Sequence, residues 1–257
     1  MGWLARVGLT ARGLVYLLLG VLAVLVAVGA TRKQLDQRGA LITVAQQPLG
    51  GVLLVLLALG FLAYAMWRFS EVFVGVSGEG DGWGPRLKSL ARGVAYLVLA
   101  VSAVTVLAGS RASQSKQQGH LAGQVMSHTG GRWLVGAVGL AIVVVGLVMV
   151  REGWSKKFLR YFGYLPSSRR EIVVQLGRIG TVSRGLVFAV TGFLVVLAAW
   201  THDPAKAGGI DEAFDTLLHQ PYGRWLVVLL GAGLIVFGVY GLAEAMWRRV
   251  PGDSSDG

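Results

Sequence analysis

Six apolar blocks divide this chain and limit what it can fold into. Five of them, at residues 13–31, 93–110, 133–150, 185–201 and 225–243, contain no charged residue. A further uncharged stretch, 39–67, is divided by Pro48, and its second part, 50–67, is the apolar one. Each block has about 17 to 19 residues, close to the ~20 that cross a bilayer as a helix. Backbone groups in lipid must be paired internally, so these Leu-, Val- and Ala-rich blocks predict six transmembrane helices.

The composition agrees with a chain that lies in lipid. Hydrophobic residues make up 54% of it and charged residues only 14%, with a mean hydropathy of +0.62. Soluble proteins carry about a quarter charged residues, so too few remain here to cover a water-exposed surface. All eight tryptophans lie at or beyond the ends of the blocks, as in the aromatic belts of membrane proteins. The sequence therefore predicts an integral membrane protein with a single membrane domain, residues 1–257.

One segment recurs three times along the chain. The pattern Arg-x5-Arg-Gly occurs at residues 6–13, 86–93 and 178–185. The same offsets, 80 and then 92 residues, carry Tyr16 onto Tyr96 and Phe188. Recurrence of this kind indicates an architecture built from copies of one unit. We expect three repeats, at about residues 3–76, 83–158 and 175–250.

The second half of each repeat recurs as well. A Pro or Gly turn at 48–50, 129–131 and 221–223 precedes the second block, which ends at a glutamate. The polar loop before the turn carries a short helix candidate, at 41–45, 125–126 and 214–218. The predicted fold class is all-α, with six transmembrane helices as three pseudo-threefold-related helical hairpins. Their common axis would run along the membrane normal.

Basic residues are distributed unevenly between the two sides. The side of the termini holds 16 of the 24 Lys and Arg, and the three other loops, near Gln34, Gln117 and Asp211, hold 8. Since cytoplasmic loops carry the excess of Lys and Arg, both termini are expected in the cytoplasm. This bias explains most of the net charge of +11, so no nucleic-acid partner is expected. The basic and aromatic segment 154–164 suits contact with anionic lipid at the cytoplasmic face.

These motifs resemble a bacterial family of six-span membrane proteins, a domain of unknown function built from a threefold two-helix unit. The resemblance rests on the repeated Arg-Gly, on Gln-Pro-x-Gly at 47–50 and 220–223, and on the terminal glutamates. It covers nearly the whole chain, although the second repeat has His128-Thr129-Gly130-Gly131 at the turn. The resemblance implies this fold and a bacterial plasma-membrane location, and it implies no activity.

Two charged triplets are the strongest polar signal. An arginine opens the first helix of each hairpin and a glutamate closes the second: Arg12, Arg92 and Arg184, with Glu71, Glu152 and Glu244. Antiparallel helices place both triplets on one membrane face, where an unpaired charge is costly. We interpret them as ion pairs that staple the bundle. A gate or binding ring around the axis is an alternative, and so is local pairing of the glutamates with Arg68, Arg151 and Arg248.

No constellation of catalytic or metal-binding residues is evident. The chain has no cysteine, and its four histidines lie in the outer loops without a spacing typical of metal ligands. The apolar blocks contain no Asp, Glu, Lys, Arg or His, which argues against proton-coupled transport. Their many glycines indicate close helix packing. We therefore predict neither enzymatic activity nor a cofactor nor a metal.

Two functional hypotheses fit this sequence. The leading one is a non-enzymatic scaffold or accessory subunit that works through helix packing with other membrane proteins or with itself. The alternative is a channel or facilitator for a small or lipophilic solute along the pseudo-threefold axis. A polar cavity on that axis would favour transport, and a packed axis would favour the scaffold.

Overall fold

The computed structural model describes residues 2–31, 34–74, 83–110, 112–162 and 167–247, and every regular element within them is a helix. Six are long and apolar enough to cross a membrane: α1 (Gly2–Ala27), α3 (Gly50–Val74), α4 (Trp83–Leu107), α6 (Gly131–Trp154), α7 (Ser167–Thr201) and α9 (Gly223–Trp247). The predicted all-α, six-span membrane fold is confirmed.

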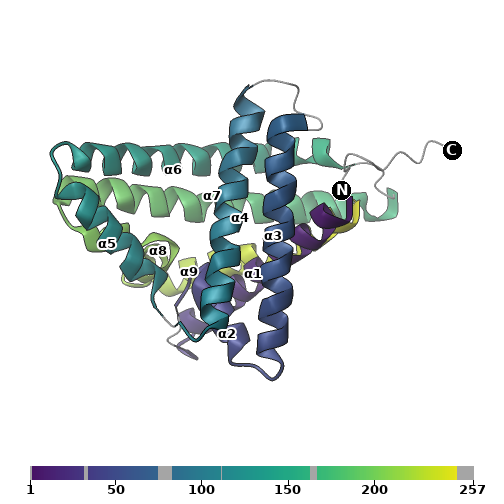
Figure 1. Cartoon of the computed structure of the whole chain (residues 1–257), viewed down its shortest axis with the longest axis horizontal. Coiled ribbons are helices and arrows are strands. Elements are labelled where there is room, and N and C mark those ends of the chain that lie inside the picture. The colour runs from purple at the N-terminus through teal and green to yellow at the C-terminus, as the bar shows by residue number, and fades with distance from the viewer. Residues whose placement is uncertain (1, 32–33, 75–82, 111, 163–166, 248–257) are drawn as a thin grey trace.

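A short helix lies in the loop of each repeat: α2 (Gln37–Ala45), α5 (Gln114–Met126) and α8 (Gly209–Leu218). α2 and α5 are longer than the apolar segments that predicted them because polar residues cap their starts. The Asp36 carboxylate accepts the N–H of Gly39, and the Ser113 hydroxyl accepts the N–H of Lys116. All three lie away from the N-terminus of α1 (Figure 1), so we call their side the short-helix side and the other the terminal side. Two 3₁₀ helices, η1 (Lys157–Tyr161) and η2 (Pro204–Ala207), complete the chain's described elements.

The turn after each short helix has the same backbone in all three repeats. Its middle residue is left-handed, with φ of 63° at Leu49, 80° at Gly130 and 61° at Tyr222. The next residue is always glycine, and a Cβ on Gly50 would stand 2.2 Å from a carbonyl oxygen of α2. Glycine is therefore the constraint at this turn, which is why the second repeat keeps it with Thr129 in place of proline.

The closest helix pairs join one repeat to the next. α3 packs along α4, α6 along α7 and α9 along α1, and the three pairs run in different directions (Figure 1). Within repeats, α1 packs on α3 and α7 on α9, but over the described residues α4 and α6 make no extended contact. The second predicted hairpin is thus splayed. The spans form an open ring in the order α4, α3, α1, α9, α7, α6, and we call the gap between its ends the α4–α6 opening.

The two spans beside this opening are the most exposed. In their most apolar stretches, 22% of α4 and 17% of α6 is buried inside the protein, against 56% of α1 and of α9. Exposed apolar helix faces of a membrane protein contact lipid tails, which are as apolar as the side chains themselves. The exposed apolar faces of α4 and α6 beside the α4–α6 opening are therefore suited to contact with lipid tails.

Glycines set the close approach in two of the three inter-repeat pairs. A Cβ on Gly238 of α9 would stand 2.7 Å from the carbonyl oxygen of Gly13 in α1, and one on Gly146 of α6 equally far from that of Gly185 in α7. The second contact of each pair lies seven residues away, at Gly20 with Gly231 and at Gly192 with Gly139. The predicted packing role of the glycines is confirmed at these positions.

The arginines of the triplet do not open their helices, and that expectation is wrong. Arg12 is the eleventh residue of α1, Arg92 the tenth of α4 and Arg184 the eighteenth of α7. The polar residues that precede them continue the helices instead of ending them. Each arginine therefore lies inside a helix, directly before the apolar block of its repeat.

Candidate functional site

A buried ion pair joins the first span to the last. The Nη2 atom of Arg12 lies 2.5 Å from an Oε atom of Glu244, and their side chains are 9% and 5% exposed. Gly241 lets α9 approach α1 closely beside this pair, since a Cβ there would stand 3.1 Å from the Cα of Gly13. This pair ties repeat 1 to repeat 3 across the α1–α9 contact.

The first repeat pairs its glutamate locally. Nη1 of Arg68 lies 2.6 Å from an Oε atom of Glu71, and the Ser89 hydroxyl donates to the same oxygen at 2.7 Å. Arg68 also donates to the Tyr64 hydroxyl, at 2.7 and 3.1 Å, and stacks on Trp67 with 4.4 Å to the ring centroid. Glu71 is therefore held by the arginine on its own helix and by a serine of the next repeat, and not by Arg92.

The third arginine has aromatic neighbours. The Arg184 guanidinium carbon lies 5.1 Å from the ring centroid of Tyr16, 5.2 Å from that of Phe188 and 5.0 Å from that of Phe237. Its Nε is buried without a hydrogen-bond partner, and none of the carboxylates in the described ranges is within ion-pair distance. The expected set of three Arg–Glu pairs is therefore wrong at Arg184.

The remaining members of the triplets lie nearer the surface. Arg92 is exposed on α4, and Glu152 is partly exposed in the last turn of α6. Of the local alternatives, Arg151 is exposed and Arg248 lies outside the described residues, as do positions 75–76 and 248–250 at the ends of two predicted repeats. Whether the pairs act as staples or as a gate stays a prediction.

A pocket of about 270 Å³ lies where the three repeats meet. Tyr16, Tyr96 and Phe188, the residues that align between repeats, all line it, together with both Arg12 and Arg184. Tyr16 packs edge-on against Phe237 with 4.9 Å between ring centroids, and Tyr96 packs against Tyr64 at the equivalent place, 4.3 Å away. Equivalent side chains thus converge on one cavity, which we call the central pocket.

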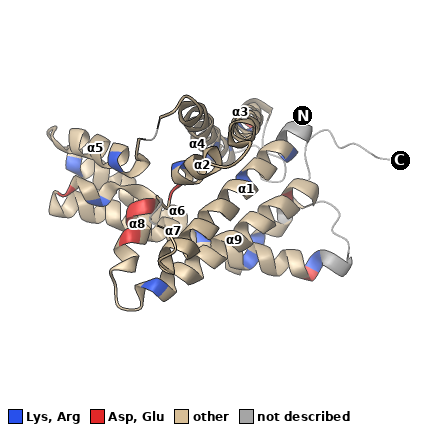
Figure 2. Cartoon of the chain, turned by 90° about the horizontal axis from the view of Figure 1, so that it is seen from below, with Lys and Arg blue, Asp and Glu red and all other residues tan. Residues whose placement is uncertain are grey.

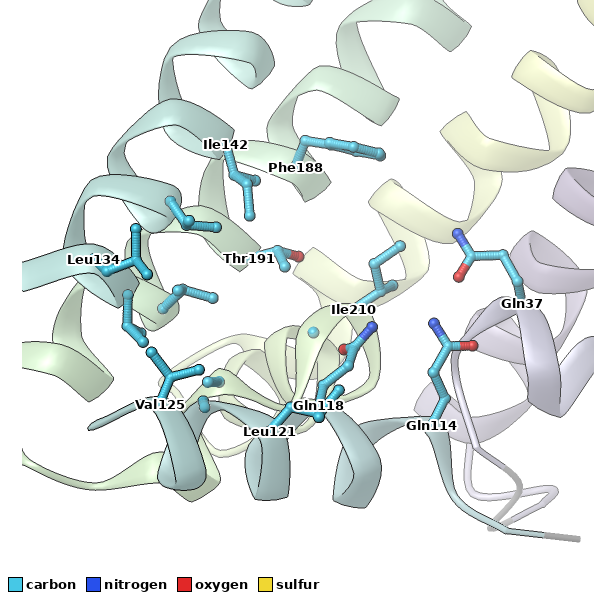
Figure 3. Close-up of a pocket in the computed structure, with 16 residues that line it drawn as sticks. Gln37, Gln114, Gln118, Leu121, Val125, Leu134, Ile142, Phe188, Thr191 and Ile210 are labelled. Atoms are coloured by element: carbon cyan, nitrogen blue, oxygen red, sulfur yellow. The ribbon is translucent and has the colours of Figure 1, made fainter. Parts of the chain in front are cut away.

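A second and larger pocket, of about 470 Å³, adjoins the central pocket. Gln37, Gln114 and Phe188 line both. Beyond the glutamines its walls are apolar side chains of α5, α6 and α7, including Leu121, Val125, Leu134, Val138 and Ile142 (Figure 3). We call it the side pocket. Together the two pockets give an apolar chamber with two arginines at one end.

The short helices line one side of this chamber, and polar contacts tie them to one another and to α4. The Leu35 N–H donates to the Asp211 carboxylate at 2.6 Å, which joins the start of α2 to α8, where acidic residues gather (Figure 2). The Arg38 guanidinium donates to the Ser110 hydroxyl at 2.9 Å, beyond the end of α4. Burial, with a smaller contribution from the nearby Asp211 carboxylate, raises the pKa of Asp36 to about 6, and burial also raises the pKa of Asp211.

A buried aromatic cluster closes the terminal side behind the arginines. Phe158 of η1 lies 5.4 Å from Tyr240 between ring centroids, and Phe162 lies 5.9 Å from it. Gly177 of α7 admits the Phe158 ring, since a Cβ there would stand 2.4 Å from it. The aromatic residues of the segment expected to meet anionic lipid are therefore partly inside the protein, which corrects that interpretation for Phe158 and Phe162.

The sequence interpretation named Arg68 only as an alternative partner of Glu71, and it did not name Gln37 or Gln114. Arg68 breaks the repeat, since its counterparts are Met149 and Gly241, and that break was a signal of a special role. Gln37 and Gln114 both directly follow the residue that caps a short helix. Glycines seven residues apart in α1, α6, α7 and α9 indicated which helices pair. Within the described ranges, no group of three His, Asp or Glu side chains is placed to hold a metal ion.

Comparison with known proteins places this chain in a family. The model of the Domain of Unknown Function (DUF1206) matches residues 7–75, 87–156 and 179–248, so each match falls within one repeat. The uncharacterized protein YxxB of Bacillus subtilis (strain 168) is 29% identical over 250 residues, which cover 95% of this chain and 90% of that protein. No solved structure matches the chain. Since the three matches together span most of its length, the chain belongs to the DUF1206 family, with three copies of the domain in one multi-pass membrane protein.

Proposed function

We propose that this membrane protein binds a lipophilic solute between its repeats, without enzymatic chemistry, and exchanges it with the bilayer. The observation that carries the proposal is the α4–α6 opening beside the chamber. α4 contributes Ala95, Tyr96, Val98 and Leu99 to the central pocket, and α6 contributes Leu134, Val135, Val138 and Ile142 to the side pocket. A solute dissolved in lipid tails can therefore reach both pockets without crossing water.

A facilitator with lateral access fits better than a continuous channel. On the terminal side, the rings of Phe158, Phe162 and Tyr240 are all buried, and none of them lines either pocket. A path along the axis would require this cluster to open. We place the termini in the cytoplasm of the bacterial cell. The part of the chamber that the short helices line then lies toward the outer half of the plasma membrane.

A scaffold or accessory subunit is the second candidate. The exposed apolar faces of α4 and α6 favour it, because a partner helix fits such a face as well as lipid does. The glycines that suggested partner docking are, however, used inside the chain, where Gly13, Gly146 and Gly238 each meet another helix. This leaves fewer small residues for contacts with a partner.

Mass spectrometry of what accompanies the purified protein tests the proposal. The protein would be extracted in a mild detergent, and its bound small molecules quantified per mole of protein. We expect one lipophilic compound at near-equal molar amount in the natural chain. Val138→Trp, which fills the side pocket, should reduce that amount several-fold, whereas Leu147→Trp, on an exposed position of α6 away from both pockets, should not.

Two outcomes would contradict the proposal. One is the absence of any compound enriched over the surrounding detergent and lipid. The other is equal retention by Val138→Trp and Leu147→Trp, which would place the compound on the outer surface. Co-purification of a stoichiometric membrane protein that is lost on substitution of exposed α4 or α6 residues would favour the scaffold instead.

A further inference from the structure

We infer that the solute of the central pocket is an amphiphile with a singly charged anionic head, a carboxylate or a phosphodiester, and that Arg184 binds this head. The inference rests on the proposed function and names the chemical class of its solute. Arg184 lines the central pocket beside Phe188, which also lines the side pocket. A head at the arginine and a chain along the side pocket thus lie in one connected space.

The depth of Arg184 makes its charge costly. Arg178, on the same helix, stacks on the exposed ring of Trp154 with 4.2 Å to the centroid, and tryptophans of this kind mark the headgroup level. Arg184 lies six residues further along α7, ~9 Å along the helix axis, at the start of the apolar block 185–201. Charged side chains at such depth pair with another group or face a cavity, and in membrane proteins they mark sites of function.

Two other buried arginines have a carboxylate partner, but Arg184 has none among the described residues. Arg12 has Glu244 and Arg68 has Glu71, each at hydrogen-bonding distance. Arg184 has three aromatic rings, whose faces attract a cation but carry no countercharge. Since the Glu244 carboxylate already balances Arg12, the central pocket presents one uncompensated positive charge. That count favours a monoanionic head.

A second copy of this chain would not supply the missing charge. The apolar blocks 93–110 and 133–150, which border the α4–α6 opening, contain no Asp or Glu. A helix packed into the opening from another copy with the same face would therefore leave Arg184 uncompensated. A lipid-derived anion brings both the charge and an apolar chain.

The side pocket suits the apolar part of such a molecule. Val125 and Leu134 lie at its far end, and Gln37 and Gln114 lie near one another at the other end, where both line the central pocket as well (Figure 3). The amide groups of these glutamines can donate to head or linkage oxygens, while the walls beyond them accept only an alkyl chain. A free fatty acid and an anionic phospholipid share this chemistry.

Binding of a matched pair of probes separates charge from apolar fit. The full chain would be placed in nanodiscs of phosphatidylcholine, a lipid with no net charge. Radiolabelled hexadecanoate is the anionic probe and radiolabelled hexadecanol the neutral one. We expect hexadecanoate to bind the natural chain with one site, and Arg184→Gln to weaken it about 10-fold to 100-fold, the range for a lost hydrogen bond to a charged group.

Variants and a second lipid complete the design. Hexadecanol binding should be unchanged by Arg184→Gln, Arg184→Lys should retain part of the hexadecanoate affinity, and Arg178→Gln should retain all of it. Adding phosphatidylglycerol to the nanodiscs distinguishes the two sources. If it displaces hexadecanoate at a few molecules per protein, an anionic phospholipid is the occupant; if it does not, the fatty acid is.

The outcomes are decisive in both directions. Equal affinity of the natural chain for hexadecanoate and hexadecanol, with no displacement by phosphatidylglycerol, overturns the anionic head and leaves a neutral lipophilic solute possible. This comparison uses the natural chain and so does not depend on the folding of a variant. If a second copy occupies the opening instead, the protein will be a dimer that binds none of the probes, and the proposed function fails with the inference.

Discussion

Arg12 and Arg184 occupy the same position in the first and third repeats, yet their surroundings differ. Arg12 meets a carboxylate at 2.5 Å, whereas Arg184 meets three aromatic rings and lines a pocket. Phe237 contributes to both sites, since it lies 5.5 Å from the Arg12 guanidinium and 5.0 Å from that of Arg184. The repeat thus fixes the depth and direction of the arginine, and its neighbours decide whether its charge is neutralised.

The neighbours differ because the helices facing the two arginines carry different residues. In α9, Gly241 lets the helix approach α1 at Gly13, and Glu244, the partner of Arg12, lies one turn later. In α6 the corresponding residue is Met149, and in α3 it is Arg68, which itself supplies the cation for Glu71. The same position of the repeat is therefore Gly241, Met149 or Arg68, and the charges around it are arranged differently in each repeat. The comparison predicts a large loss of unfolding free energy where a substitution breaks an ion pair, and a small loss where the arginine has no carboxylate partner.

The largest effect is expected at Arg68. Its side chain is 1% exposed and that of Glu71 4%, so Arg68→Met would leave a buried carboxylate with only the Ser89 hydroxyl. Breaking a buried pair costs about 3–5 kcal/mol. Unfolding by SDS titration in mixed micelles measures this loss. A loss below about 1 kcal/mol would mean that the pair behaves like an exposed one.

A slightly smaller loss is expected at Glu244. Glu244→Gln keeps the shape of the side chain but leaves Arg12 without its countercharge, at a cost of about 2–4 kcal/mol in a partly hydrated site. The double swap of Arg12→Glu with Glu244→Arg should recover part of the loss, because the pair is restored in reverse. If the double swap is as unstable as the sum of both single changes, the pair does not act as a staple.

Asp36 offers the opposite case, a buried carboxylate with one unpartnered oxygen. Its folded pKa of about 6 lies above the ordinary 3.8, so the folded state prefers the protonated form. The stability that this proton provides is present below about pH 4 and is lost as the pH rises through about 6. Asp36→Asn keeps an acceptor for Gly39, and it should raise stability above pH 7 by up to ~3 kcal/mol.

The check is a pair of stability profiles from pH 4 to pH 8. The natural chain should lose more stability than Asp36→Asn over this range. The charges of Arg38 and Asp211 also act on the pKa of the Asp36 carboxylate. Asp211→Asn therefore serves as the control for the effect of neighbouring charges. Parallel profiles for the natural chain and Asp36→Asn would show that folding does not raise the pKa of Asp36.

The smallest effect is expected at Arg184. Arg184→Gln removes a deep cation that has no carboxylate partner, so the unfolding free energy should change by less than about 1 kcal/mol, in either direction. The same SDS titration compares it directly with Glu244→Gln. A loss as large as that of Glu244→Gln would show that the aromatic rings neutralise the charge as well as a carboxylate does, and the contrast between the two arginines would disappear.

The sequence predicted the elements of this fold better than their partners. Hydropathy reports the transfer of whole segments into lipid, and it located all six spans. Symmetry between repeats predicted that Tyr16, Tyr96 and Phe188 occupy matching places. Which helices touch depends on single positions, such as the glycines that bring α6 against α7 while α4 stands apart. The chamber exists because one contact of six is missing, and a repeat pattern gives no sign of a missing contact.

The order of the ring also has a consequence for how the protein is made. α1 is the first span to be inserted, and its main partner, α9, is the last. The pairs α3–α4 and α6–α7 join neighbouring segments of the chain and can form as soon as they are synthesised, whereas the α1–α9 contact must wait for the whole polypeptide. Until then Arg12 stays in the membrane without Glu244. An unfinished copy therefore carries one more uncompensated charge in its spans than a finished one, and only the last span removes it.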